Sequence, residues 1–414
     1  MFHRSAMKLS STGTAAFFTP HLLPSRMKNL GIIELNNPGA LNALNLDMVR
    51  SINSALAAWD ANDSVKATLF VGRESTNKKG ETRPVFCAGG DVKSVYESGM
   101  KKVCDEEGKQ PYHGYGKSNL LTSDFFREEY IMNHRIATQK SSCPQISIWD
   151  GVVMGGGVGI SVHGKYRIAT ENTLFAMPET GIGLFPDVGG MYFLPRLKGG
   201  LGPYIALTGA KLKANDLIYA GIATHYIPSS KIEDLTSSLA DATVGSSQDA
   251  DVVGDVLASF REVTDTYNSH LVKNRENIDF AFEGKESAED IVTALKDLAS
   301  RDNEKCKDFG TQTLSTLLKM SPTSVKVTLE GLKRGASVKD ITEDLKMEYR
   351  MSQGFMREGS DFYEGIRAVL VDKDRNPKWN PNTLDGVSND HVESYFENLG
   401  ENELNFEKSP SPKL

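Results

Sequence analysis

The feature that most constrains this 414-residue chain is a glycine-rich segment that also carries two carboxylates in an apolar run. Residues 151–190 read GVVMGGGVGISVHGKYRIATENTLFAMPETGIGLFPDVGG, and the two carboxylates are Glu179 and Asp187. A helix that begins at glycines leaves backbone N–H groups unpaired and open to a developing negative charge, as an oxyanion hole requires. Carboxylates among apolar side chains lose hydration, which raises their pKa and suits them to proton transfer. The segment therefore predicts a catalytic centre.

Composition and charge exclude several classes of protein. The formal net charge of −7 argues against nucleic acid as the main ligand, because binding to phosphate backbones depends on clustered Lys and Arg. No uninterrupted apolar run approaches the roughly 20 residues that cross a bilayer, so we expect no membrane span. The 4 cysteines are too scattered for a zinc site and too few for a secreted disulfide scaffold. We expect a globular protein without a bound metal.

The two ends of the chain carry possible targeting signals. The first 33 residues contain basic residues, several Ser and Thr, and no Asp or Glu, which is the composition of a mitochondrial transit peptide. A disordered tail or a misplaced gene start is the alternative interpretation. The last three residues, Pro-Lys-Leu, are similar to a peroxisomal signal but match it imperfectly. We expect the mitochondrial matrix, with the peroxisome as the second choice.

Alternating strand and helix patterns predict an α/β fold with crossover connections. Strands are expected at 30–35, 66–72 and 145–149 and near residues 166 and 174, and a helix at 48–59. After about residue 201 helical patterns dominate, for example at 231–240, 289–300 and 324–334. The polar stretch 92–123 predicts a long loop or mobile lid. We divide the chain into a transit peptide or tail (1–28), an α/β core (29–210), a helical region packed on the core (211–395) and a polar tail (396–414).

A second glycine motif strengthens the catalytic interpretation. Residues 87–91 read CAGGD and follow a short apolar stretch. Alone, such a pair of glycines most often marks an ordinary tight turn. Two loops that each follow a strand and present glycine amides can instead converge on one carbonyl oxygen, which polarises an acyl thioester without a metal.

These motifs carry a family resemblance. The strings LNNPGALNALN, FCAGGD and GVVMGGGVGISVHG together resemble the crotonase (enoyl-CoA hydratase/isomerase) superfamily, whose members bind acyl-CoA thioesters. The strings FFREEY, FAMPETGIGLFPDVGGMYFLPRL, MEYR and DFYEGIRAVLVDKDRNPKW are similar to the branch that hydrolyses 3-hydroxyisobutyryl-CoA to 3-hydroxyisobutyrate and CoA in valine breakdown. The resemblance implies a crotonase-like spiral of ββα units with a mostly helical C-terminal region. It implies no cofactor and allows a homo-oligomer. The strand that usually precedes Gly31 is not evident.

The resemblance also implies the site residues. The amides of Gly90 and Gly156 would form the oxyanion hole, and Glu179 would be the principal carboxylate. Asp187 and Glu129 match the remaining substrate-contacting positions, where they would orient water or the 3-hydroxyl group. Glu179 would either activate water as a general base or attack the thioester to form an acyl anhydride, and the sequence does not choose between the two.

Two alternative functions stay open. Hydratases of this superfamily use two glutamates, one at the position of Glu179 and one where this chain has Gly159. Asp187 stands where the hydratase pattern has a small residue. The chain thus lacks one hydratase acid at Gly159 and gains another at Asp187, which favours thioester hydrolysis over hydration or isomerisation of an enoyl-CoA. The second alternative is a non-enzymatic component of the mitochondrial ribosomal small subunit, which the acidic charge balance opposes.

Overall fold

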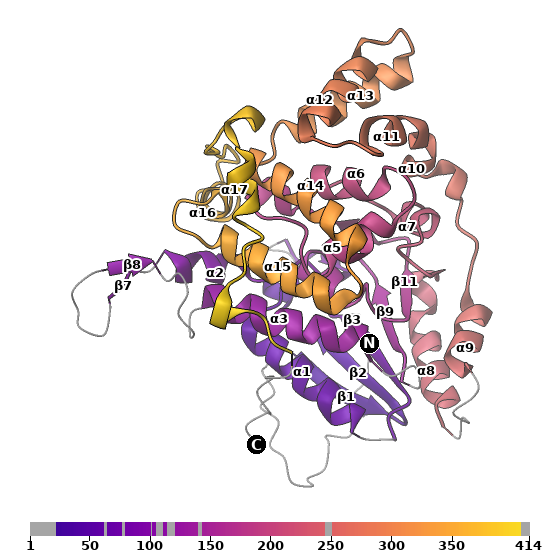
Figure 1. The fold of residues 1–414 in the computed structure, drawn as a ribbon. Coiled ribbons are helices and arrows are strands. Elements are labelled where there is room, and N and C mark those ends of the chain that lie inside the picture. The colour runs from indigo at the N-terminus through magenta and orange to yellow at the C-terminus, as the bar shows by residue number, and fades with distance from the viewer. Residues whose placement is uncertain are drawn as a thin grey trace.

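Two sheets form the centre of the N-terminal half (Figure 1). The computed structural model describes residues 22–61, 64–76, 79–100, 102–104, 111–113, 121–139, 143–244 and 251–406. The larger sheet has the order β1-β2-β3-β9-β11-β13 and the smaller one β12-β10-β6, and their neighbouring strands are parallel except for β1 and β2. The strands are β1 (Leu22–Met27), β2 (Leu30–Leu35), β3 (Ala67–Gly72), β6 (Val85–Cys87), β9 (Gln145–Trp149), β10 (Val152–Met154), β11 (Tyr166–Ala169), β12 (Leu174–Ala176) and β13 (His225–Tyr226).

Successive turns of the chain give one strand to each sheet. β3 is followed by the two-stranded sheet of β4 (Ser75–Thr76) and β5 (Thr82–Arg83) and then by β6, while β9 is followed by β10 and β11 by β12. Within the larger sheet β3, β9 and β11 are neighbours, and within the smaller sheet β6, β10 and β12 are neighbours. This arrangement is the predicted spiral of ββα units. Because the strands of the smaller sheet are parallel, the loops that follow β6, β10 and β12 meet at one edge of that sheet.

The predicted elements of the core are confirmed, and their local causes are visible in the structure. β2 and β9 have the predicted bounds. The predicted helix at 48–59 lies within α1 (Leu46–Asp60), whose apolar stripe at Met48, Ile52 and Leu56 is buried. The Asn45 side chain accepts a hydrogen bond from Met48 N at 2.9 Å and caps the helix.

The C-terminal half is helical, as predicted. The helices expected at 231–240, 289–300 and 324–334 are α8 (Ile232–Ala242), α12 (Ala288–Ser300) and α14 (Pro322–Ser337). α15 (Ile341–Phe355) packs on α3 (Leu121–Ala137), so the C-terminal region reaches the core (Figure 1). Within the described residues no helix is both long enough and apolar enough to span a membrane. α5 (Gly190–Phe193) and α6 (Leu201–Thr208) close the core segment. The helical region also contains α7 (Ala214–Ala220), α9 (Val252–Phe260), α10 (His270–Lys273), α11 (Arg275–Phe282), α13 (Glu304–Leu317), α16 (Asp361–Ile366) and α17 (Asn389–Glu393).

The strand before Gly31 that is not evident in the sequence is present in the structure as β1. β1 pairs with β2 in antiparallel register, with Arg26 opposite Gly31. The strand lies inside the segment 1–28 that we predicted as a transit peptide or tail, and residues 1–21 lie outside the described residues. Its sequence, LLPSRM, contains a proline, which a strand tolerates at the edge of a sheet, and β1 is an edge strand.

The predicted long loop at 92–123 is also partly wrong. α2 (Val92–Gly99) begins directly after the CAGGD motif, and the Asp91 side chain caps it by accepting from Ser94 N at 3.1 Å. α3 starts at Leu121, and β7 (Lys102–Cys104) pairs with β8 (Pro111–His113) in an antiparallel hairpin. The rest of this stretch lies outside the described residues. The aspartate at the end of the glycine motif is therefore a helix cap, a local signal that polar composition conceals.

The predicted polar tail from residue 396 begins as a packed segment. Arg127 of α3 donates hydrogen bonds to the backbone oxygens of Asn402 and Glu403, at 3.0 and 3.3 Å. The Phe406 ring stacks on His134 with 4.1 Å between ring centroids. Residues up to Phe406 thus lie against α3, while residues 407–414 lie outside the described residues.

Candidate active site

The backbone amides of Gly90 and Gly156 lie side by side. A Cβ atom added to Gly156 would lie 3.2 Å from Gly90 N, so the loops after β6 and β10 approach each other closely. Gly90 stands two residues before α2, and Gly156 is the first residue of α4 (Gly156–Gly159). Within the described part of the chain no hydrogen bond uses either amide. Both N–H groups are therefore available to a ligand oxygen, and their role as an oxyanion hole stays a prediction.

Backbone packing fixes these two loops, which we call the glycine loops (residues 87–91 and 154–157). Leu44 N donates to Gly89 O at 2.8 Å, and Asp91 N donates to Leu44 O at 2.7 Å. Gly155 has φ of 46°, a value that favours glycine. A Cβ on Gly157 would lie 2.5 Å from Cys87 O, which leaves no space for a side chain. The glycines therefore serve both close packing and exposure of the amides.

Glu179 follows the third strand of the smaller sheet and faces the glycine loops. It is the first residue of η2 (Glu179–Ile182), three residues after the end of β12. Its Oε1 atom lies 2.9 Å from the position of a Cβ on Gly155, and its buried Oε2 atom has no hydrogen-bond partner among the described residues. Burial, together with the charge of Asp187, raises the pKa of Glu179 well above its usual value. An unpaired basic carboxylate beside the amides is placed to act as a base or a nucleophile.

Glu129 reaches the same place from the other side. It lies on α3, and its Oε1 atom is 2.6 Å from the position of a Cβ on Gly156. That oxygen is buried and has no hydrogen-bond partner among the described residues. Burial is the main cause that raises the pKa of Glu129, and the charges of Asp187 and Glu179 add to it. Three predicted carboxylates therefore share one buried region.

Asp187 differs from the other two because its carboxylate is paired. The Tyr130 hydroxyl donates to Asp187 Oδ2 at 2.8 Å, and both side chains are buried. Burial raises the pKa of Asp187 to about 7, and the hydrogen bond from Tyr130 acts in the opposite direction. We call residues 187–191 the Asp187 turn. The structure thus brings together all five predicted residues, and it adds Tyr130, which the FFREEY string contained without an assigned role.

The position of Gly159 explains why a second glutamate is absent there. A Cβ on Gly159 would lie 2.5 Å from Val188 Cβ and 2.6 Å from Asn133 Nδ2, so no larger side chain fits. Asn133 is fully buried, and neither polar atom of its side chain has a hydrogen-bond partner among the described residues. It follows Glu129 by one helical turn on α3, a spacing from which its place could have been predicted. Asn133 is a further polar group that the sequence analysis missed.

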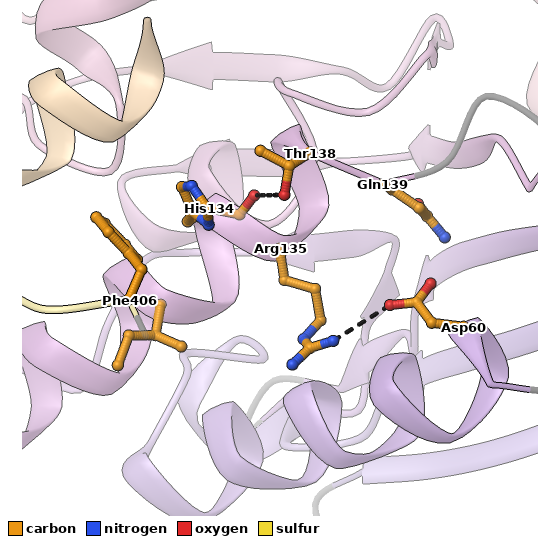
Figure 2. A pocket seen from close by; sticks show the side chains of 7 residues that line it. Asp60, His134, Arg135, Thr138, Gln139 and Phe406 are labelled. Atoms are coloured by element: carbon orange, nitrogen blue, oxygen red, sulfur yellow. Dashed lines mark hydrogen bonds and ion pairs between the residues drawn. The ribbon is translucent and has the colours of Figure 1, made fainter. Parts of the chain in front are cut away.

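A separate cavity of about 290 Å³ lies against the other side of α3 (Figure 2). Of its lining residues, Arg135 donates to Asp60, which also lines the cavity, at 3.2 Å and to Asn53 at 2.7 Å. None of the predicted site residues lines it. Among the described residues no group of three or more His, Cys, Asp or Glu is arranged to hold a metal ion. We therefore assign the candidate active site to the glycine loops and the three carboxylates.

Comparison with known proteins connects this geometry to a family. The family model for enoyl-CoA hydratase/isomerase matches residues 30–396. A mitochondrial 3-hydroxyisobutyryl-CoA hydrolase from Xenopus tropicalis is 44% identical over 376 residues, which are 90% of this chain and 88% of that protein. Proteins of the same name from Danio rerio and Dictyostelium discoideum are 43% and 41% identical, over 96% and 90% of this chain and 93% and 90% of their own.

Solved structures share the fold. The crystal structure of a carnitinyl-CoA dehydratase from Mycobacterium thermoresistibile superimposes with a TM-score of 0.78 at 34% identity, over 94% of this chain and 100% of that chain. An enoyl-CoA hydratase from Rhodobacter sphaeroides gives a TM-score of 0.75 at 31% identity, over 93% of this chain and 99% of that chain.

Proposed function

We propose that this chain, which belongs to the enoyl-CoA hydratase/isomerase family and to its 3-hydroxyisobutyryl-CoA hydrolase branch, hydrolyses 3-hydroxyisobutyryl-CoA to 3-hydroxyisobutyrate and CoA. The observation that carries the proposal is the exchange of acidic groups within the site. The Gly159 position is filled by Val188 and Asn133, while Asp187 adds a buried carboxylate. A site that lacks one glutamate of a hydratase and gains an acid elsewhere suits thioester hydrolysis.

The chemistry follows from the placement of the groups. The thioester oxygen accepts hydrogen bonds from the amides of Gly90 and Gly156, which polarise the carbonyl and stabilise the alkoxide that forms. Glu179 takes a proton from a water molecule as the water oxygen bonds to the carbonyl carbon. The tetrahedral intermediate then collapses, the C–S bond breaks, and the departing CoA thiolate takes the proton that Glu179 had accepted. Asp187 and Glu129 orient the water or the 3-hydroxyl group.

A second route uses Glu179 as a nucleophile. Its carboxylate attacks the carbonyl carbon, CoA leaves as the thiolate, and water then opens the acyl anhydride. The unpaired Oε2 atom is compatible with either route. Single-turnover hydrolysis in ¹⁸O-labelled water with mass spectrometry of the active-site peptide, together with trapping by hydroxylamine, tests for the anhydride. Label in Glu179 or a hydroxamate formed at Glu179 indicates the anhydride, whereas label confined to the product acid without a hydroxamate at Glu179 favours the general base.

The activity is tested by the release of free thiol from a panel of short acyl-CoA thioesters. We expect turnover of 3-hydroxyisobutyryl-CoA and little loss of the conjugated absorbance of crotonyl-CoA. Turnover of crotonyl-CoA without thiol release from the hydroxyacyl substrate would replace the proposal by the hydratase alternative. Co-sedimentation with ribosomal particles in the absence of hydrolysis would support the ribosomal role, which the relatives do not favour.

Cofactor use and location are further parts of the proposal. The amides and carboxylates supply the polarisation and proton transfer, so we expect full activity after dialysis against a metal chelator. We propose the mitochondrial matrix, supported by relatives named as mitochondrial. Imaging of the full chain with a C-terminal and, separately, an N-terminal fluorescent tag tests this, since blocking the N-terminus should prevent matrix import. Peroxisomal signal that depends on a free C-terminus would favour the alternative.

A further inference from the structure

The turn that carries Asp187 has an unfavourable backbone conformation. Val188 has φ of 56°, and Gly189 follows with φ of 84°. A β-branched residue such as valine rarely adopts the left-handed conformation, because its side chain then clashes with the backbone. The resulting strain persists only where the surrounding contacts enforce it. The Asp187 turn therefore needs contacts that hold it, and these contacts identify the residues on which the position of Asp187 depends.

One of these contacts comes from the C-terminal helical region. Glu348 of α15 accepts hydrogen bonds from Gly189 N at 2.7 Å and from Met191 N at 2.8 Å, one on each carboxylate oxygen. On the other side His163 donates from its Nε2 atom to Val188 O at 2.8 Å. Burial lowers the pKa of His163 to about 4, so the ring is neutral. The turn is held through its amides by Glu348 and through its carbonyl by His163.

Glu348 is fully buried, and a buried carboxyl group is costly unless its hydrogen bonds compensate. Burial is the main cause that raises its pKa, and the charges of Asp344 and Asp187 add to it. Asp344 lies one turn earlier on α15, beside Glu348, and is equally buried, yet its carboxylate oxygens accept no hydrogen bond from the Asp187 turn. Of these two buried acids, only Glu348 bonds to the turn.

We propose that Glu348 is a positioning residue that fixes the Asp187 carboxylate by clamping the amides of Gly189 and Met191. The inference rests on the proposed function, in which Asp187 acts on the substrate or the attacking water. The Asp187 carboxylate is thereby fixed twice, by Tyr130 at its side chain and by Glu348 at the backbone that follows it. Through Glu348 of α15, the C-terminal region thus contributes to the position of Asp187.

A double-mutant cycle tests the positioning role. Glu348→Gln places an N–H donor against one of the two amides, so it breaks half of the clamp while preserving volume. We expect kcat to fall on the order of 10²-fold with little change in KM, because a small displacement of a reacting group has an effect of that size. In an Asp187→Asn background the same substitution should lower kcat little further, because both changes act through one group. Equal losses in both backgrounds would overturn the proposal.

The matched control is Asp344→Asn, which removes the neighbouring buried acid but leaves both amide contacts intact, and we expect it to retain kcat. A comparable loss in this variant would overturn the specific role of Glu348. If Glu348→Gln does not fold, Glu348→Asp takes its place in the cycle, since it keeps both acceptors but retracts them by one methylene. It should give an intermediate loss of kcat.

Hydrogen exchange keeps this test separate from the test of the activity. The amides of Gly189 and Met191 should exchange faster in Glu348→Gln than in the wild type or in Asp344→Asn. Unchanged exchange at these two amides would refute the clamp, whatever the activity. The three proteins can show these exchange differences while the wild type releases no thiol. That result would refute the proposed function and leave the clamp established.

Discussion

The glycine loops and the Asp187 turn meet in one site but are held by different means. The glycine loops lie at the ends of neighbouring strands and are fixed by backbone contacts, such as that of Leu44 N with Gly89 O at 2.8 Å. The Asp187 turn is fixed by the side chains of Tyr130, His163 and Glu348. Local chain geometry therefore places the amides of the proposed oxyanion hole, whereas distant side chains hold the Asp187 carboxylate in position.

The glycine loops and the Asp187 turn also differ in how much buried charge they contain. The glycine loops contain no fully buried charged group. The amides of Gly90 and Gly156 have no hydrogen-bond partner among the described residues and are free to bind an oxygen of the substrate. The Asp187 turn and its surroundings bury several carboxyl groups whose pKa values are raised by burial, among them Glu129 and Glu348. Such groups reduce stability in exchange for reactivity, so substitutions in the two regions should differ in what they change.

The largest effect is expected where the two regions meet. Glu179 faces Gly155 of the glycine loops, and its pKa is raised by the charge of Asp187 as well as by burial. Glu179→Gln should lower kcat on the order of 10³-fold, because it removes the base or nucleophile while preserving shape. Thiol release at saturating substrate measures it, with thermal unfolding as the control for folding. Normal kcat in this variant would remove Glu179 from the mechanism.

A slightly smaller loss should follow from filling the oxyanion position. Gly156→Ala would place a Cβ atom 2.6 Å from Glu129 Oε1 and 3.2 Å from Gly90 N. We expect kcat to fall roughly 10²-fold to 10³-fold, the effect of losing one oxyanion donor. Gly39→Ala is the matched control, because a Cβ there meets nothing within 4 Å and Gly39 lies outside the glycine loops. Similar losses in both variants would mean that the effect is not local to the oxyanion hole.

A moderate effect that depends on pH is expected from Tyr130→Phe. The Tyr130 hydroxyl lowers the pKa of Asp187, which burial has raised to about 7, so its removal should raise that pKa further. If ionised Asp187 is the active form, the acid limb of kcat/KM moves to higher pH and activity at pH 7 falls about tenfold. Tyr349→Phe is the control, because its hydroxyl contacts Arg127 instead. An unshifted limb in Tyr130→Phe would contradict the role of the hydrogen bond.

The smallest effect on activity, with a measurable effect on stability, is expected from Asp344→Asn. Burial raises the folded-state pKa of Asp344 from 3.8 to about 7. The stability contribution of this group is therefore full below pH 4 and is lost as pH rises through about 7. The asparagine does not ionise, so Asp344→Asn does not lose stability as pH rises. Its free energy of unfolding should therefore exceed that of the wild type by roughly 1 to 3 kcal/mol at pH 8.

Denaturant unfolding at pH 4 and pH 8 provides the comparison for Asp344→Asn. The difference between the variant and the wild type should be small at the lower pH and largest at the higher one. A constant difference at both values would show that packing, and not ionisation, sets the stability of α15.

Much of the fold could be predicted from local patterns. β2 and β9 have the predicted bounds because their apolar residues are consecutive and punctuated by turn residues. β1 and α2 were missed, since an edge strand containing Pro24 has little apolar signal and α2 is short and lies beside a polar stretch. Such elements form because neighbouring parts of the chain pair with them or cap them, which composition does not report.

The amino-acid sequence was enough to locate the glycine amides after two strands and the carboxylates Glu179 and Asp187, and the family resemblance added Glu129. The glycine motifs are local features, because a strand, a glycine and a helix start lie within a few residues of one another. How Asp187 is held became visible in the folded chain alone. Its hydrogen bond to Tyr130 joins residues 57 positions apart, and the clamp by Glu348 spans 159 positions from Gly189. Contacts over such separations depend on the packing of α3 and α15 around the core, which no local pattern encodes.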